Sequence, residues 1–137
     1  MKKIVLSLLG CLLAWGLSAQ QTPIKLVLDV SSESPEVHRT AARHLRLMSE
    51  AYPDSQFEMV IYSAAYKMVD KKESAAGETL AQVVKLPNVS VVVCEQSLKR
   101  HNLTVDDLIP GVTTVPDGIY EIVIRQQQGW GYVKEVR

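Results

Sequence analysis

The sequence predicts an α/β domain whose mostly parallel sheet is covered by helices on both sides. Two observations predict this class. Short runs of branched apolar residues alternate along the chain with amphipathic segments, and such alternation of strands and helices is typical of parallel sheets. One run, Val89–Cys94, is apolar at almost every position, as are strands that are buried on both faces.

The first strand and the first helix follow one another closely. Residues 24–30 are rich in branched apolar side chains and predict the strand. Ser34 followed by Pro35 predicts the start of a helix, with Ser34 as the N-cap and Pro35 in the first turn. Apolar residues then recur at spacings of three and four as far as Tyr52, so we expect an amphipathic helix that ends before Pro53.

The middle of the chain continues the alternation. Residues 57–62 predict the second strand, and residues 63–70 predict a short helical or irregular stretch behind it. Residues 74–85 predict a further helix that is closed by Pro87, because the residue before a proline avoids the helical region. Val89–Cys94 is the clearest strand of the chain, and we predict that it lies in the centre of the sheet.

Two short elements are predicted after this strand. Residues 95–101 predict a helix that begins directly behind it. Thr104 and Asp107 have the spacing of a capping box and predict a short helix that stops at Pro110. Residues 112–115 predict a short strand.

The C-terminus predicts a last helix and an edge strand. Asp117 is expected to cap the helix, and Gly129 is expected to end it. Residues 130–133 predict the strand. Trp130 and Tyr132 are two residues apart and therefore point to the same face, where they cover either the core or a contact between subunits.

The N-terminus has the three parts of a secretory signal peptide. Two lysines precede an apolar run at residues 4–17, and the small residue Ala19 marks a cleavage site. The run is shorter than the roughly 20 residues that a helix needs to cross a bilayer. We therefore expect residues 1–19 to be removed. Residues 20–137 would then form one exported domain, periplasmic or secreted from a bacterium, without attachment to the membrane.

Only one cysteine is expected in the mature chain. Of the two in the sequence, Cys11 lies within the apolar run of the signal peptide. It comes too early for lipoprotein processing, because apolar residues continue after it, so we expect it to be lost with the signal. Cys94 then has no partner for an intramolecular disulfide.

Charge and motif content argue against several classes of function. The formal net charge is zero, and loss of the two N-terminal lysines leaves a slight acidic excess, so nothing favours nucleic acid or anionic membranes. The sequence has neither a glycine-rich phosphate loop after the first strand nor a Gly-x-Ser-x-Gly elbow. His38 and His44 lie six residues apart on the first helix, and no acidic or cysteine ligand completes a metal site. We expect neither a cofactor nor a metal.

Cys94 is the candidate for chemistry because it ends the strongest strand, and ligands of parallel sheets collect beyond the carboxyl ends of strands. The dipole of the following helix, together with Lys99 and Arg100, favours a reactive thiolate, whereas Glu95 opposes it. His101, seven residues on, is a candidate acid–base partner. Alternatively, Cys94 is a small apolar core residue and His101 an ordinary polar residue at a helix end.

Four motifs of the C-terminal half occur in the order and at the spacing of a known family. They cover residues 91–98, 103–112, 115–122 and 127–133, while residues 25–30 and 59–69 fit more loosely. On these motifs the chain resembles the DsrE-like (DsrE/DsrF-like) family. The resemblance implies a three-layer α/β/α fold with a five-stranded, mainly parallel sheet, commonly assembled into trimers or hexamers.

The resemblance also concerns the site. Some members of the family relay sulfur as a cysteine persulfide, and Cys94 occupies the position of their sulfur-carrying cysteine. This chain has Ser63 and Ala64 where the family often has glycine, after the second strand. It also has His44 near the place of a frequent asparagine, so His44 is either a substitute pocket residue or a surface residue.

The sequence thus leads to the hypothesis of an exported homo-oligomer that binds or transfers sulfur through a persulfide on Cys94. Lys99 or Arg100 would supply positive charge, and a sulfur donor or acceptor protein would be the partner. One alternative is a non-catalytic oligomeric binding module in which Cys94 is structural. Another is a binder of small ligands that uses the same end of the sheet without covalent chemistry.

Overall fold

The computed structural model describes residues 21–136 and contains one parallel sheet. Its five strands are β1 (Lys25–Val30), β2 (Gln56–Ile61), β3 (Val89–Cys94), β4 (Thr113–Val115) and β5 (Gly131–Lys134). They lie in the order β4-β3-β2-β1-β5, and every neighbouring pair is parallel. The predicted α/β fold is confirmed, with a sheet that is parallel throughout.

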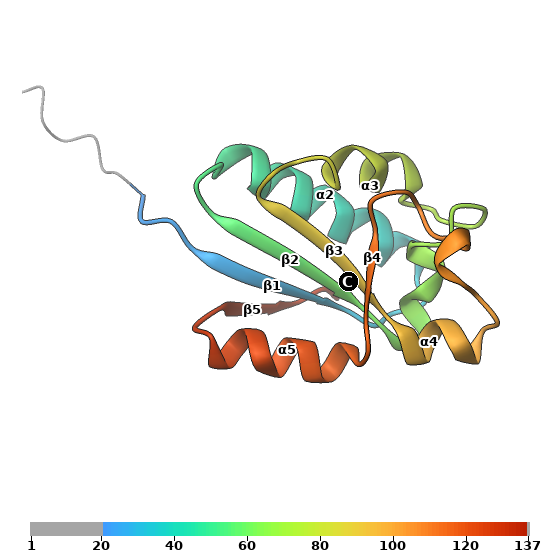
Figure 1. The fold of residues 1–137 in the computed structure, drawn as a ribbon. Helices are drawn as coiled ribbons and strands as arrows, with labels where there is room; N and C mark the ends of the chain where they lie inside the picture. The colour runs from blue at the N-terminus through green and yellow to red at the C-terminus, as the bar shows by residue number, and fades with distance from the viewer. Residues whose placement is uncertain (1–20, 137) are drawn as a thin grey trace, which may run out of the picture.

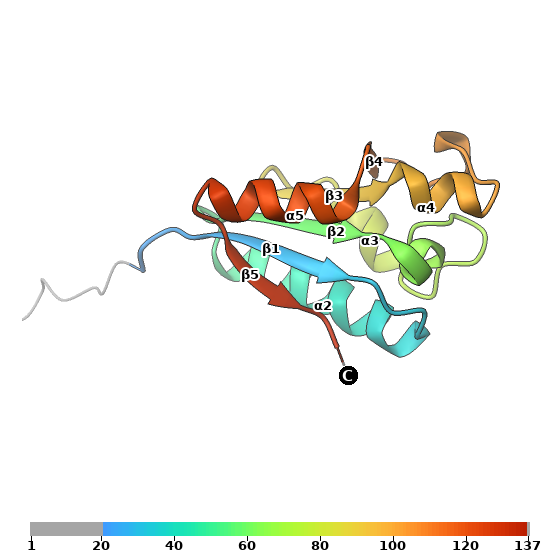
Figure 2. The same cartoon turned by 90° about the horizontal axis from the view of Figure 1, so that it is seen from below.

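Helices cover both faces of the sheet. The chain forms α2 (Pro35–Ala51), α3 (Gly77–Val83), α4 (Glu95–Arg100) and α5 (Gly118–Gln127), with short 3-10 helices η1 (Ser63–Met68) and η2 (Val105–Asp107). Figures 1 and 2 show α2 and α3 on one side of the sheet, and α4 and α5 on the other. The layers are therefore α/β/α, and β4 and β5 form the two edges.

The predicted signal peptide, residues 1–19, lies outside the described residues. Within residues 21–136, no helix combines the length and the apolar character needed to cross a bilayer.

The apolar strand β3 lies second from the edge of the sheet, and the prediction of a central position was wrong because β2 is the middle strand. An apolar run indicates that both faces of a strand are covered by other parts of the protein. It does not indicate how many strands lie on each side of that strand in the sheet. The last four residues of β3 are buried, since β2 and β4 pair with its two sides and helices cover its faces. The three-residue strand β4 is enough to cover the end that carries Cys94.

The helix α2 begins and ends as predicted. Pro35 occupies the first turn, and Ser34 has the extended backbone of an N-cap, although its side chain makes no capping hydrogen bond. The N–H of Tyr52 donates to the carbonyl of Met48 and closes the last turn. The helix buries the face that carries Val37, Ala41 and Leu45 against the sheet.

The helix α3 is shorter than the predicted span of residues 74–85. Ser74 is not part of it, because its hydroxyl donates to the carbonyl of Met68 and accepts from the N–H of Ala76. A serine that bonds the nearby backbone in this way competes with the helical hydrogen-bond pattern. The helix therefore begins at Gly77, where this turn ends.

The two sides of the sheet differ in what they bury. The larger apolar cluster lies under α2 and α3, whereas the smaller cluster under α5 consists of Val27, Val60, Val92 and Ile122. Side chains alternate along a strand, so Asp29, two residues after Val27, also faces α5. The side that α5 covers therefore has a small apolar core and a buried carboxylate beside it.

Candidate functional site

Cys94 is the last residue of β3 and the N-cap of α4, with an extended backbone. It lies two residues after Val92, which belongs to the cluster under α5, so its side chain faces α5. The thiol is free and its residue is only 6% exposed. The strand thus delivers Cys94 to the carboxyl edge of the sheet, where parallel sheets collect ligands.

A hollow of about 230 Å³ opens beside Cys94, and we call it the Cys94 hollow. It is formed by the residues that follow β2, the end of β3, one side of α4 and the start of α5. Its lining includes Tyr62, Ser63, Cys94, Ser97, Arg100 and Gly118. Segments far apart in the sequence therefore meet at this one thiol.

Gly118 lets α5 begin directly against Cys94. A Cβ at this position would lie 3.0 Å from the Cβ of Tyr62 and 3.3 Å from the Cβ of Cys94. Asp117 caps the helix as predicted, since its carboxylate accepts the N–H of Tyr120 at 3.0 Å. The cap and the missing side chain together fix one wall of the Cys94 hollow.

Ser63 and Ser97 build the opposite wall. Ser63 has a φ of 55°, a left-handed conformation that glycine adopts most easily. Its N–H donates to the Ser97 hydroxyl oxygen at 2.8 Å. Ser97 is 3% exposed and lines the Cys94 hollow. Its hydroxyl therefore joins α4 to the residues that follow β2 at this wall.

The two predicted cations are placed differently. Lys99 is an exposed residue that pairs with Glu95 at 3.9 Å, and it does not line the Cys94 hollow. Arg100 does line it, and among the described residues Arg100 has no ion-pair partner. The structure thus brings Arg100, and not Lys99, to the site.

His101 lies on a second, larger hollow of about 670 Å³. Its ring stacks on Tyr66, with 3.7 Å between ring centroids and an angle of 14° between the planes. We call this space the Tyr66 hollow. It shares Ser63 and Arg100 with the Cys94 hollow, so the two spaces adjoin. His101 lines only the Tyr66 hollow. Its predicted role as acid–base partner of Cys94 is therefore not supported by a contact between the two side chains among the described residues.

His44 is part of neither hollow. It belongs to α2, which covers the opposite face of the sheet from α5 (Figure 2), and its Nδ1 lies 3.0 Å from a carboxylate oxygen of Glu135. The structure therefore places His44 in a partly exposed hydrogen bond that ties the C-terminal segment to α2. Within residues 21–136, His38 and His44 are not part of any cluster of three metal-ligating side chains.

A polar cluster lies next to the Cys94 hollow at the end of β1. The buried carboxylate of Asp29 accepts the Tyr132 hydroxyl at 2.6 Å and the Lys134 ammonium at 3.1 Å. The hydrogen bond to Asp29 raises the pKa of Tyr132. Tyr62, which lines the Cys94 hollow, donates to Asp29 at 3.4 Å. This cluster fastens β5 to β1 and orients one wall of the site.

The predicted aromatic pair of the edge strand is likewise engaged within the chain. Trp130 packs under the guanidinium of Arg125, 4.9 Å from the ring centroid. Tyr132 is 41% exposed but anchors its hydroxyl on Asp29. Both side chains therefore help to hold β5 in place.

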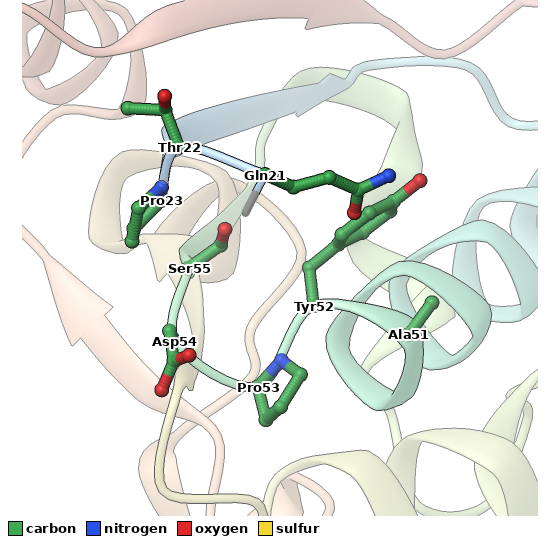
Figure 3. Close-up of a pocket in the computed structure, with 8 residues that line it drawn as sticks. All are labelled: Gln21, Thr22, Pro23, Ala51, Tyr52, Pro53, Asp54 and Ser55. Atoms are coloured by element: carbon green, nitrogen blue, oxygen red, sulfur yellow. The ribbon is translucent and has the colours of Figure 1, made fainter. Parts of the chain in front are cut away.

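Another hollow, of about 250 Å³, lies at the opposite end of the sheet (Figure 3). It is formed by the residues that precede β1 and by the connection from α2 to β2. Its lining includes Tyr52, Asp54 and Ser55 and has no cysteine or histidine. The Ser55 hydroxyl accepts the N–H of Ile24 at 3.0 Å. We therefore assign no chemistry to this end.

Ser97 and Gly118 are site residues that sequence reasoning missed, whereas Ser63 was noted only for standing where glycine is frequent. Ser97 has a signal in the sequence, because residues three apart on a helix are neighbours and Ser97 follows Cys94 by three. The place of Gly118 depends on a contact between distant segments.

The comparisons with solved structures concern the fold. The chain is similar to the "Protein of Unknown Function MTH1491" from Methanobacterium thermoautotrophicum, at 22% identity and a TM-score of 0.74 over 81% of this chain and 98% of that chain. It is also similar to the ychN protein of E. coli, at 14% identity and a TM-score of 0.66 over 83% of this chain and 99% of that chain. A third similar structure is the "Conserved Protein of Unknown Function BT1422" from Bacteroides thetaiotaomicron, at 12% identity and a TM-score of 0.66 over 80% of this chain and 93% of that chain.

None of the curated protein sequences matches the chain. The model of the DsrE/DsrF-like family, in contrast, matches residues 25–134, which include every strand of the sheet and Cys94. The chain therefore belongs to the DsrE/DsrF-like family.

Proposed function

We propose that the protein is a sulfur carrier that holds sulfur as a persulfide on Cys94. The observation that carries the proposal is the setting of the thiol. Cys94 borders a hollow that Ser97 and Arg100 also line, and Arg100 has no ion-pair partner among the described residues. A thiol that only fills the core would not need a hollow lined by polar side chains beside it.

Each group has a part in the proposed chemistry. The Cys94 thiolate attacks the outer sulfur of a donor persulfide, the S–S bond of the donor breaks, and the donor leaves as a thiolate. Arg100 places a positive charge on the lining of the same hollow. The Ser97 O–H is placed to donate to a sulfur or oxygen atom of the bound molecule. The helix α4 adds little, since six residues carry only a small dipole.

We also propose that the chain assembles with copies of itself, as proteins of this family commonly do. The exposed edge of β5 supports this, because Tyr132 and Val133 are 41% and 42% exposed on a strand with one free side. An oligomeric binding module with a structural Cys94 remains the second candidate function. Export to the periplasm or the medium is part of the proposal and rests on the N-terminal sequence.

The experiment is sulfur loading of folded residues 20–137. After incubation with a low-molecular-weight persulfide and removal of the reagent, intact-mass spectrometry is expected to show the gain of one sulfur atom. A second thiol, such as dithiothreitol, should remove it. A folded protein that keeps its original mass at all donor concentrations would overturn the proposal.

A further inference from the structure

The Tyr66 hollow adjoins the Cys94 hollow, and the sulfur chemistry proposed above does not use it. Its volume of about 670 Å³ falls in the range of small-molecule sites, which is roughly 300–1,000 Å³. The Cys94 hollow, at about 230 Å³, has room only for the reacting end of such a molecule. Together the two hollows have room for an organic molecule whose body lies in the Tyr66 hollow and whose sulfur reaches Cys94.

The charges of the Tyr66 hollow favour an anionic molecule. The cations Lys67 and Arg100 line it, against one acidic residue, Glu33. Lys67 is partly neutralised by Glu73 at 3.4 Å, whereas Arg100 has no ion-pair partner within residues 21–136. Arg100 is also the only charged residue that lines both hollows. Its planar guanidinium suits a carboxylate, which it binds with two parallel hydrogen bonds.

Ser97 also lines the Cys94 hollow. Its side chain is buried, with the residue 3% exposed, and its oxygen accepts the N–H of Ser63 at 2.8 Å. This hydrogen bond holds the Ser97 hydroxyl beside Cys94, where it would donate to an acceptor atom of a bound molecule.

We propose that the sulfur donor is a small organic persulfide that carries a carboxylate. Its carboxylate binds Arg100 in the Tyr66 hollow, and its persulfide enters the Cys94 hollow. This inference rests on the proposed sulfur-carrier function. In the reaction, R–S–SH and the Cys94 thiolate give the Cys94 persulfide and R–S⁻. One S–S bond forms as another breaks, the electron pair leaves with R–S⁻, and no external oxidant or reductant is needed.

The test compares two donors on folded residues 20–137. Glutathione persulfide carries carboxylates, and the persulfide of 2-mercaptoethanol carries none. The rate of sulfur loading is measured by intact mass, and each rate is divided by that of the denatured chain to remove the intrinsic reactivity of the donor. We expect the folded protein to favour the glutathione donor by about tenfold, the size of one charged hydrogen-bonded contact at a partly exposed site.

Variants on α4 assign the preference to a residue. Arg100→Gln is expected to slow loading from both donors, because Arg100 supplies the positive charge beside Cys94, and to bring the ratio of the two normalised rates close to one. Lys99→Gln removes the neighbouring charge, which lines neither hollow, and should behave as the unmodified protein. Ser97→Ala is expected to slow loading from both donors.

The outcomes separate this inference from the function on which it rests. If the unmodified protein loads sulfur from both donors at equal normalised rates, and Arg100→Gln does not change their ratio, the proposal of a carboxylate-bearing donor is overturned. The sulfur-carrier function would not be affected by that result. If Lys99→Gln abolishes the preference for glutathione persulfide to the same extent as Arg100→Gln, the proposal of a carboxylate-bearing donor is also overturned. The general positive charge of α4, and not a specific contact with Arg100, would then be responsible. No loading from either donor would overturn both proposals.

Discussion

Cys94→Ser is expected to abolish sulfur loading and to leave the protein folded. Serine has nearly the same shape as cysteine, and a hydroxyl at this place borders a hollow of about 230 Å³, which is large enough for water. We expect the free energy of unfolding to fall by only about 1 kcal/mol, the usual effect of a polar group at a nearly buried position. Serine cannot form a persulfide, so the variant should keep its original mass after incubation with any persulfide.

Two measurements accompany this variant. Cys94→Ala serves as the matched control, because it removes the sulfur without adding a hydroxyl, and it should show the same complete loss of loading. Urea unfolding of both variants checks the fold. A variant that still gains sulfur would exclude Cys94 as the carrier. A serine variant that fails to fold while the alanine variant is stable would favour a structural thiol.

Arg125→Met is expected to have the largest effect on stability, about 3 kcal/mol. Arg125 holds the buried carboxylate of Glu58 through two hydrogen bonds, at 2.7 Å and 3.0 Å. Removal of one partner leaves an unpaired charge on a residue that is 1% exposed. We use the lower end of the range for such pairs, because the Arg125 side chain is 29% exposed. Urea unfolding measures the change.

The loss should depend on pH in a definite direction. Burial raises the pKa of Glu58, and the hydrogen bond and charge of Arg125 oppose this rise. Without Arg125 the pKa of Glu58 in the folded state rises further above its ordinary value of 4.5. The unmodified protein and the variant differ in the folded-state pKa of Glu58, so the loss grows as pH rises above the folded-state pKa of the unmodified protein, which is itself above 4.5. It should be larger at neutral pH than at acidic pH.

Matched variants identify the cause. Arg46→Met removes an exposed pair with Glu50, and its effect should stay below about 1 kcal/mol. The double variant Glu58→Leu with Arg125→Met removes both charges and should recover much of the loss. If Arg125→Met is no more harmful than Arg46→Met, then the buried pair does not contribute to stability as described.

The parts of the site that the sequence could predict are local. The apolar run of β3 and the helix that follows it are visible in the pattern, and they alone place Cys94 at the carboxyl edge of a sheet. The spacing from Glu95 to Lys99 is that of a helical ion pair, which the structure contains. The sequence could therefore have indicated that Arg100 is the freer cation.

The remaining parts depend on contacts between distant segments. Gly118 approaches Cys94 because α5 begins against the end of β3, and nothing in the spacing of the two residues reports this. His101 stacks on Tyr66, a partner from another element, which takes it to the larger hollow. The central position predicted for β3 was wrong for a related reason. The hydrophobicity of a strand indicates that it is buried, but its position in the sheet is set by the order in which the strands pair, which hydrophobicity does not indicate.

The most direct test of the proposed carrier is the rate at which iodoacetamide alkylates Cys94 in folded residues 20–137, compared with the same chain in denaturant. Cys94 is the only cysteine of these residues, so the label reports this thiol alone. The proposal predicts that the folded protein reacts at a rate comparable to or above that of the denatured chain, because Cys94 opens onto a hollow beside Arg100. Alkylation that occurs only after denaturation would contradict it and identify Cys94 as a structural residue.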